Sequence, residues 1–372
     1  MKSKLKILYI TNVPSPYRLD YFKELGKYCN LTVLFEKSTS DERDSSWTNY
    51  NFQNFTGIIM NGYKVSTDSA FCPNVLKYIG KEKFDHIVIT DFLLPTGMLA
   101  ILYMRFFGIK YWLESDGGFS KNGEGIKEKI KKFFIKNAYG YFSTCDNHDN
   151  YYLSYGATPE RIFRYIFTSL RDKDIEETPL VHESKIKLRK DLNIDSKKVV
   201  LGVGRFIHLK GYDNILEVAK IMMKQDIKFV IIGGNPTEEY LKYIKENNLK
   251  NVIFINHLQK DELKRYYRLA DVFVHPTRSD VWGLVINEAM ANGLPIITTN
   301  KCNAGLELIS NGKNGYIIDV DNVEELQDAI INTLKNSCQM GNESLRTIKN
   351  YTIENMAKEH MVYFEKEKST IK

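Results

Sequence analysis

Two carboxylates, Asp280 and Glu288, are separated by seven residues in the stretch FVHPTRSDVWGLVINEAMANGLPIITT. Apolar runs at 272–274 and 296–299 predict two strands on either side of this pair. Between them, the polar loop 276–283 leads into a helix, because apolar residues recur there at helical spacing and a Gly-x-Pro sequence ends it. The pattern predicts one strand-helix-strand step of a parallel sheet, with one carboxylate in the loop and the other on the helix.

The start of this helix is suited to binding a negatively charged ligand. The first amide groups of a helix lack partners within it and lie at its positive end. Here they belong to Gly283, Leu284 and Val285. Such an end accepts an anion, and the nearby carboxylates can accept hydrogen bonds from hydroxyl groups. An ordinary surface loop with a helix cap is the alternative.

The whole stretch resembles the signature of retaining glycosyltransferases of family 4, which is Glu, seven residues, Glu, then Ala-Met-Ala-x-Gly-x-Pro-Ile. Asp280 replaces the usual first Glu with a side chain one methylene shorter. The resemblance implies that Glu288 holds the nucleotide ribose. It also implies that Asp280 and the amides of Gly283, Leu284 and Val285 hold the donor sugar.

A second loop, GRFIHLKG at 204–211, places Arg205 and Lys210 between a strand and a helix. A departing nucleotide diphosphate gains negative charge as the sugar bond breaks, so two cations there stabilise the transition state more than the ground state. The resemblance implies this role for both. The dinucleotide-binding fingerprint Gly-x-Gly-x-x-Gly is disfavoured. Gly202 and Gly204 fit its first two glycines, but Ile207 stands at the position of the third.

Further residues are predicted to contact the donor. Gly233 and Gly234 follow a strand and let the backbone approach a nucleotide closely. The resemblance implies that main-chain groups near His257 and Leu258 meet the base, without naming it; a UDP-sugar is the favoured donor. It also implies front-face attack with retained configuration, and no metal or other cofactor.

The pair Asp319 and Asp321 resembles a manganese-binding Asp-x-Asp, but Asp321 followed by Asn322-Val323-Glu324 and a helical run reads as a capping box that opens a helix. We therefore predict no metal site there.

The first half of the chain alternates strands and helices, which predicts a doubly wound parallel sheet whose ligands bind at the carboxyl ends of the strands. Two loops at that edge supply acceptor-binding candidates: Tyr17 and Arg18 after the first strand, and Asp116 in ESDGG. A rigid turn with a surface arginine is the alternative for the first loop. His148, in a third loop, is more typical of a helix cap or core residue than of a catalyst.

The segment 121–137, KNGEGIKEKIKKFFIKN, holds six lysines and two glutamates around an apolar stripe. A basic amphipathic helix of this kind can lie on an anionic membrane surface. The alternative is a solvated helix that packs its apolar side into the domain.

Composition supports a globular protein of two domains. A chain of 372 residues is longer than a single hydrophobic core usually supports. Of its residues, 43% are hydrophobic and 26% are charged, and the net charge is +6. Five scattered cysteines without metal-ligand spacing indicate reduced thiols in a cytoplasmic protein. The longest apolar stretch, 97–109, contains Arg105 and is too short to span a bilayer.

The resemblance implies the α/β architecture called GT-B, with two facing doubly wound domains and a C-terminal helix that crosses back to the first. We assign an acceptor domain to 1–170, an interdomain connection to 171–192, a nucleotide-sugar domain to 193–350 and the returning helix to 351–372.

The expected function is transfer of a hexose or N-acetylhexosamine to a glycan, lipid-linked and belonging to cell-surface polysaccharide synthesis of the capsular type. The expected place is the cytoplasm, peripherally on the inner face of the plasma membrane, and no nucleic acid is expected as a partner. Two alternatives remain: a nucleotide-sugar 2-epimerase of the same architecture, and a non-catalytic nucleotide-sugar-binding partner subunit.

Overall fold

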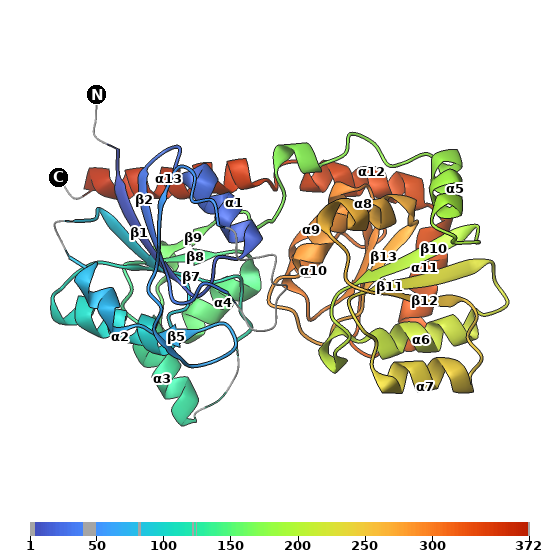
Figure 1. The fold of residues 1–372 in the computed structure, drawn as a ribbon, viewed down its shortest axis with the longest axis horizontal. Coiled ribbons are helices and arrows are strands. Elements are labelled where there is room, and N and C mark those ends of the chain that lie inside the picture. The colour runs from blue at the N-terminus through green and yellow to red at the C-terminus, as the bar shows by residue number, and fades with distance from the viewer. Residues whose placement is uncertain (1–3, 40–49, 81–82, 121–122, 124, 371–372) are drawn as a thin grey trace. The chain divides into compact units, whose positions relative to one another are not determined.

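The computed structural model describes residues 4–39, 50–80, 83–120, 123 and 125–370. The chain forms two compact units, each with its own sheet (Figure 1). Unit 1 comprises Met1–Ser169 together with Thr352–Lys372, and unit 2 comprises Leu170–Tyr351.

Unit 1 is built on a seven-stranded parallel sheet of order β3-β2-β1-β6-β7-β8-β9. Its central strands are almost fully buried because helices cover both faces, which is why they read as continuous apolar runs. The strands are β1 (Lys6–Thr11), β2 (Asn30–Phe35), β3 (Thr56–Ile59), β6 (His86–Ile89), β7 (Trp112–Glu114), β8 (Gly140–Ser143) and β9 (Ile162–Arg164). The helices among them are α1 (Pro16–Leu25), α2 (Pro95–Phe106), α3 (Ile126–Ile135) and α4 (Asp146–Ser154), and the short strands β4 (Tyr63–Lys64) and β5 (Ala70–Phe71) form an antiparallel pair.

Helix α13 (Ile353–Thr370) completes unit 1 although it lies far along the chain. It packs beside α1, as Figure 1 shows. Its Phe364 is fully buried between the rings of Trp112 and Phe142, and the Phe364 carbonyl lies 3.0 Å from His86 Nε2. The segment that contains this helix therefore belongs to the same compact unit as the N-terminal sheet.

Unit 2 holds a six-stranded parallel sheet of order β12-β11-β10-β13-β14-β15. The reversal of order beside β10 is the doubly wound arrangement that the alternating pattern predicted. The strands are β10 (Lys198–Val203), β11 (Ile227–Ile232), β12 (Val252–Ile255), β13 (Val272–His275), β14 (Ile296–Thr299) and β15 (Gly315–Ile318). The helices are α5 (His182–Asp191), α6 (Tyr212–Ile221), α7 (Glu238–Glu246), α8 (Lys260–Leu269), α9 (Leu284–Ala291), α10 (Asn303–Leu308), α11 (Val323–Lys335) and α12 (Ser337–Ile348).

The segment 171–192 differs from the expected interdomain connection, because it belongs to unit 2 and contains α5. This helix packs through cations instead of an apolar stripe. Arg189 is buried, donates to the Leu269 carbonyl at 2.6 Å and pairs with Asp271 at 2.7 Å. Lys185 donates to the Ala270 carbonyl at 2.5 Å. Long cationic side chains carry enough apolar stem to replace the missing aliphatic residues.

The basic segment 121–137 forms α3 from Ile126 onward, and Lys121, Asn122 and Glu124 lie outside the described residues. Within the part of the chain that the structure describes, no helix has the length and apolar character needed to cross a bilayer.

Candidate functional site

Two loops of unit 2 lie together at the carboxyl end of the sheet, after the neighbouring strands β10 and β13. The Leu209 carbonyl accepts from the Arg278 amide at 2.8 Å and from Thr277 Oγ1 at 2.9 Å. Arg278 also donates to the His208 carbonyl at 2.6 Å. The loop that carries Lys210 is therefore fixed against the loop that carries Asp280.

This arrangement brings two predicted site residues into direct contact. Lys210 Nζ lies 2.6 Å from Asp280 Oδ2, and His275 Nε2 lies 2.9 Å from the same oxygen. Burial favours the neutral form of Asp280, but the hydrogen bond from His275 and the charge and hydrogen bond of Lys210 outweigh burial and hold its pKa well below the usual range. Burial also lowers the pKa of His275, so a neutral imidazole donates to an ionised carboxylate.

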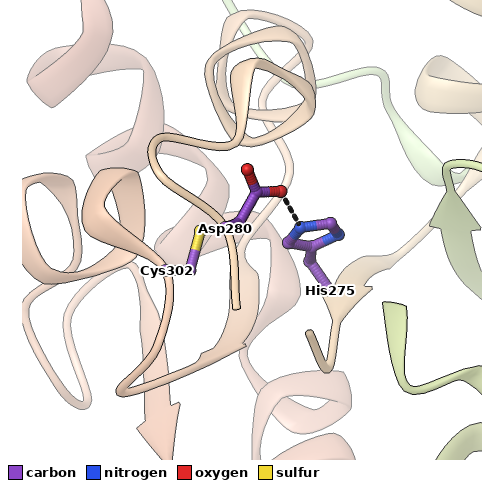
Figure 2. A group of neighbouring side chains, drawn as sticks. All are labelled: His275, Asp280 and Cys302. Carbon is purple, nitrogen blue, oxygen red and sulfur yellow. Dashed lines mark hydrogen bonds and ion pairs between the residues drawn. The ribbon is translucent and has the colours of Figure 1, made fainter. Parts of the chain in front are cut away.

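His275, Asp280 and Cys302 together offer three metal-ligand atoms within 4.8 Å of one another, and Figure 2 shows them converging. The Cys302 thiol donates to the Trp282 carbonyl at 3.0 Å, and burial raises its pKa to about 12. A metal needs the thiolate, and the cation position beside Asp280 is held by the Lys210 ammonium. The group is therefore better described as a carboxylate held by a lysine and a histidine.

The N-terminal end of α9 lies directly after this group. Gly283 precedes the helix with φ of +104°, a left-handed conformation that disfavours other residues, and an added Cβ would come within 2.8 Å of Cys302 Sγ. Trp282 is buried, and its Nε1 donates to Asn287 Oδ1 at 2.9 Å. These contacts fix the first turn, where Leu284 and Val285 are half-buried and their amides belong to the free end of the helix.

Glu288 lies on α9, one helical turn beyond Leu284, and is half-buried. Its Oε2 accepts from the hydroxyl of the buried Tyr267, on α8, at 2.9 Å. Tyr267 holds the carboxylate in one orientation, which is what a residue that binds a ribose diol requires.

The glycines predicted to approach the nucleotide come from the ends of β10 and β11. A Cβ on Gly233 would lie only 1.7 Å from the Gly204 carbonyl oxygen, so the two loops touch there and admit no side chain. Gly234 has φ of +102° and faces open space. Arg205, next to this contact, is exposed.

His257 and Leu258 follow β12, where His257 is exposed and Leu258 half-buried. The His257 amide already donates to Asn256 Oδ1 at 2.7 Å. This amide is one of the main-chain groups expected to meet the base, and it already has a hydrogen-bond partner within its own loop.

The acceptor candidates form a compact group in unit 1. Arg18 pairs with Asp116 at 2.7 Å and with the fully buried Glu114 at 3.4 Å, and Tyr17 donates to Asp116 Oδ2 at 2.9 Å. Arg18 is 7% exposed, so the alternative of a surface arginine is wrong. The contacts with Arg18 and Tyr17 hold Asp116 at the carboxyl edge of the sheet.

His148 is buried in unit 1, as the core alternative predicted. Its Nδ1 accepts from the Thr144 amide at 3.2 Å, its Nε2 lies 2.9 Å from Ser115 Oγ, and burial lowers its pKa to about 3. A neutral histidine with these contacts orients the loop that carries Asp116.

The cap near Asp321 differs in detail from the expected one. Asn322 caps α11 by accepting from the Glu325 amide at 3.1 Å, whereas Asp321 pairs with Arg278 at 2.7 Å and accepts from Asn214 at 2.9 Å. Asp321 therefore stabilises the loop beside Lys210.

Sequence reasoning missed His275 and Tyr267. A single histidine at the end of an apolar strand was the available signal for the first, since strand ends of a parallel sheet face the site. Tyr267 lay within a helix of ordinary appearance, and its partner was visible only in three dimensions.

Part of the chain is similar in sequence to known glycosyltransferases. Residues 184–354 match the family Glycosyl transferases group 1. An uncharacterized glycosyltransferase of Haemophilus influenzae is 30% identical over 170 residues, which are 44% of this chain and 47% of that protein. A GDP-mannose-dependent alpha-mannosyltransferase of Corynebacterium glutamicum is 32% identical over 141 residues, or 38% and 32% of the two chains. The chain thus spans less than half the length of these curated relatives.

Among solved structures, HepE of Anabaena in complex with UDP superposes with a TM-score of 0.77 at 15% identity, over 97% of this chain and 100% of that one. Residues 184–354 are therefore similar in sequence to the group 1 glycosyltransferases, in a chain with the GT-B fold.

Proposed function

We propose that this protein is a glycosyltransferase that moves a hexose or N-acetylhexosamine from a nucleotide-diphosphate sugar to a glycan, with retained configuration. A UDP-sugar is the favoured donor, and the relative solved with UDP supports that choice. The acceptor is a lipid-linked glycan of cell-surface polysaccharide synthesis, which places the protein peripherally on the inner face of the plasma membrane.

The observation that carries this proposal is the contact between Lys210 and Asp280 at the free end of α9. The ammonium and the helix end provide positive charge for the departing diphosphate, while the ionised Asp280 accepts hydrogen bonds from sugar hydroxyls. Glu288, held by Tyr267, supplies the ribose contact. Tyr17 and Asp116 in unit 1 are the proposed contacts for the acceptor hydroxyl.

A panel of nucleotide sugars tests the proposal and names the donor. In the absence of acceptor, slow release of free nucleotide diphosphate and sugar from one donor is expected. A 2-epimerase would instead return an isomerised nucleotide sugar. Tight binding of one donor without turnover, with or without a glycan acceptor, would identify a non-catalytic binding subunit and contradict the proposal.

Chelation is expected to leave this hydrolysis unchanged, because Lys210 and the start of α9 supply the positive charge that a metal supplies elsewhere. The measurement compares rates in EDTA with rates in added Mn²⁺ or Mg²⁺. Loss of activity in EDTA that manganese restores would overturn the metal-free mechanism.

Glu288→Ala is expected to weaken binding of the donor nucleotide by about 1.5 to 3 kcal/mol, because a ribose hydroxyl loses a charged acceptor. Titration calorimetry with UDP measures this change. Tyr267→Phe, which keeps the carboxylate but removes its 2.9 Å hydrogen bond, should cause a smaller loss. Equal affinity of wild type and Glu288→Ala would place the ribose elsewhere.

A further inference from the structure

Helix α3 presents its apolar stripe to solvent. Ile126, Ile130 and Phe133, spaced to share one helix face, are 78%, 42% and 53% exposed. The opposite face holds the helix to unit 1: Ile135 is fully buried, and Glu128 accepts from Tyr155 and from Lys131. A helix of a globular domain normally turns its apolar stripe inward. This one turns it outward, so the alternative of an inward-packed stripe is wrong for these three residues.

The C-terminal end of α2 adds aromatic surface beside this stripe. Phe106 and Phe107 are 84% and 48% exposed, with their rings 4.9 Å apart. The preceding residue, Arg105, donates to the Phe133 carbonyl at 2.6 Å and to the Phe134 carbonyl at 3.0 Å. Its guanidinium also lies over the Phe133 ring, 5.1 Å from the centroid. Arg105 therefore joins the end of α2 to the end of α3.

Exposed single apolar side chains are ordinary on a protein surface, but five large ones on two linked helices are not. We call this group, Phe106, Phe107, Ile126, Ile130 and Phe133, the α2–α3 apolar surface. Lysines border it along α3 and at the C-cap of that helix: Lys127, Lys129, Lys132 and Lys136 are all exposed, and Glu128 is the single acid of the helix. Lys131 is committed to Glu128 at 3.1 Å.

We infer that the α2–α3 apolar surface inserts into the interfacial region of an anionic lipid bilayer. Lysines around an outward apolar stripe match a surface that is negatively charged outside and apolar just beneath. A protein partner would need its own acidic rim around an apolar face, whereas an anionic bilayer supplies both by its construction. The inference rests on the membrane location given in the proposed function. Its tests measure vesicle binding and require no sugar transfer.

Insertion and charge attraction alone predict different responses of vesicle binding to salt. Salt screens the lysines, but burial of the apolar side chains persists at high ionic strength. Binding to anionic vesicles should therefore weaken in salt and leave a residual fraction. Arg105 is essential to this arrangement because it fixes the two helix ends together.

Vesicle sedimentation of the full chain tests the inference, with phosphatidylglycerol-containing vesicles against pure phosphatidylcholine. The wild type should pellet with the anionic vesicles. The triple variant Ile126→Ser, Ile130→Ser, Phe133→Ser should lose at least about tenfold in partition coefficient, since three apolar side chains no longer leave water on binding. The variant Lys127→Glu, Lys129→Glu, Lys132→Glu should lose binding at low salt. Leu241→Ser is the matched control, because Leu241 is 50% exposed on α7 of unit 2.

Tryptophan fluorescence separates insertion from surface adsorption. The chain already contains Trp47, Trp112 and Trp282, so a difference spectrum between Phe133→Trp and the wild type, each recorded with the same vesicles, reports the new site. Anionic vesicles should shift its emission to the blue, and brominated lipid should quench it, whereas Leu241→Trp should show neither effect.

Three outcomes would overturn the inference. They are equal vesicle binding by the triple serine variant, an unshifted difference spectrum for vesicle-bound Phe133→Trp, and a dimer in sedimentation velocity that the triple variant abolishes. The last would assign the surface to a second copy of the chain. Donor hydrolysis by the triple variant is measured in parallel. If hydrolysis persists without insertion, the inference alone fails, and if no donor turns over, the proposed function fails separately.

Discussion

Lys210→Ala is expected to lower kcat by about two to three orders of magnitude while the fold remains intact. The ammonium lies in the loop that precedes α6 and contacts Asp280 at 2.6 Å. From this position it can stabilise the negative charge that develops as the diphosphate departs. Because the interaction strengthens in the transition state, the loss should fall on kcat more than on KM. Steady-state kinetics with the donor found in the panel measure it.

Lys301→Ala is the matched control. Lys301 is exposed in the neighbouring loop, and its backbone carbonyl, which the substitution retains, accepts from the Asp280 amide at 2.8 Å. Lys301→Ala removes one positive charge, as Lys210→Ala does, and should leave kcat nearly unchanged. Arg205→Ala should act in the same direction as Lys210→Ala. Similar kcat values for Lys210→Ala and Lys301→Ala would remove Lys210 from the reaction.

Glu114→Ala is expected to destabilise unit 1 by about 3 to 5 kcal/mol, because it leaves the Arg18 guanidinium without its fully buried counter-ion. Glu114 is fully buried at the end of β7, where it pairs with Arg18 and accepts from Tyr9 at 3.0 Å. Urea denaturation at pH 7 measures the loss. Glu160→Ala, at an exposed position of the same unit, should change stability little.

The difference in stability between the wild type and Glu114→Ala should depend on pH. Burial raises the pKa of Glu114, but His360, whose Nε2 lies 3.6 Å from the carboxylate, the charge of Arg18 and the hydrogen bond from Tyr9 outweigh burial and lower it overall. Its contribution to stability is therefore complete above the usual carboxyl pKa and is lost as pH falls through the lowered value. The gap between wild type and Glu114→Ala should shrink in acid. A gap that is absent at pH 7 would mean that Arg18 finds other partners.

The fold of the second unit was predictable from local pattern. Strands β13 and β14 are short runs bounded by proline, and their predicted bounds, 272–274 and 296–299, agree with the structure to within a residue. In the first unit β3 and the β4–β5 pair were missed, because 50–71 lacks a sustained apolar alternation. Helix α5 was missed because Lys185 and Arg189, which read as surface residues, are its buried ones.

The candidate site was predictable in part. Motif spacing placed Lys210 and Asp280 in loops at the same sheet edge, but only the folded chain shows that they touch. Spacing could not reveal that Arg18 is enclosed by Glu114 and Asp116, because burial of a charge depends on elements far apart in sequence. The roles assigned to these residues in donor and acceptor binding stay predictions until the substitutions above are measured.

The return of α13 to unit 1 bears on how the protein is made. Trp112, Phe142 and His86 lie in strands synthesised early, yet their cover, Phe364, leaves the ribosome more than two hundred residues later. Until then, unit 1 has an open aromatic face, while the residues of unit 2 are already available to fold. Translation order thus delays completion of unit 1, and chaperone binding to nascent chains should persist until α13 emerges.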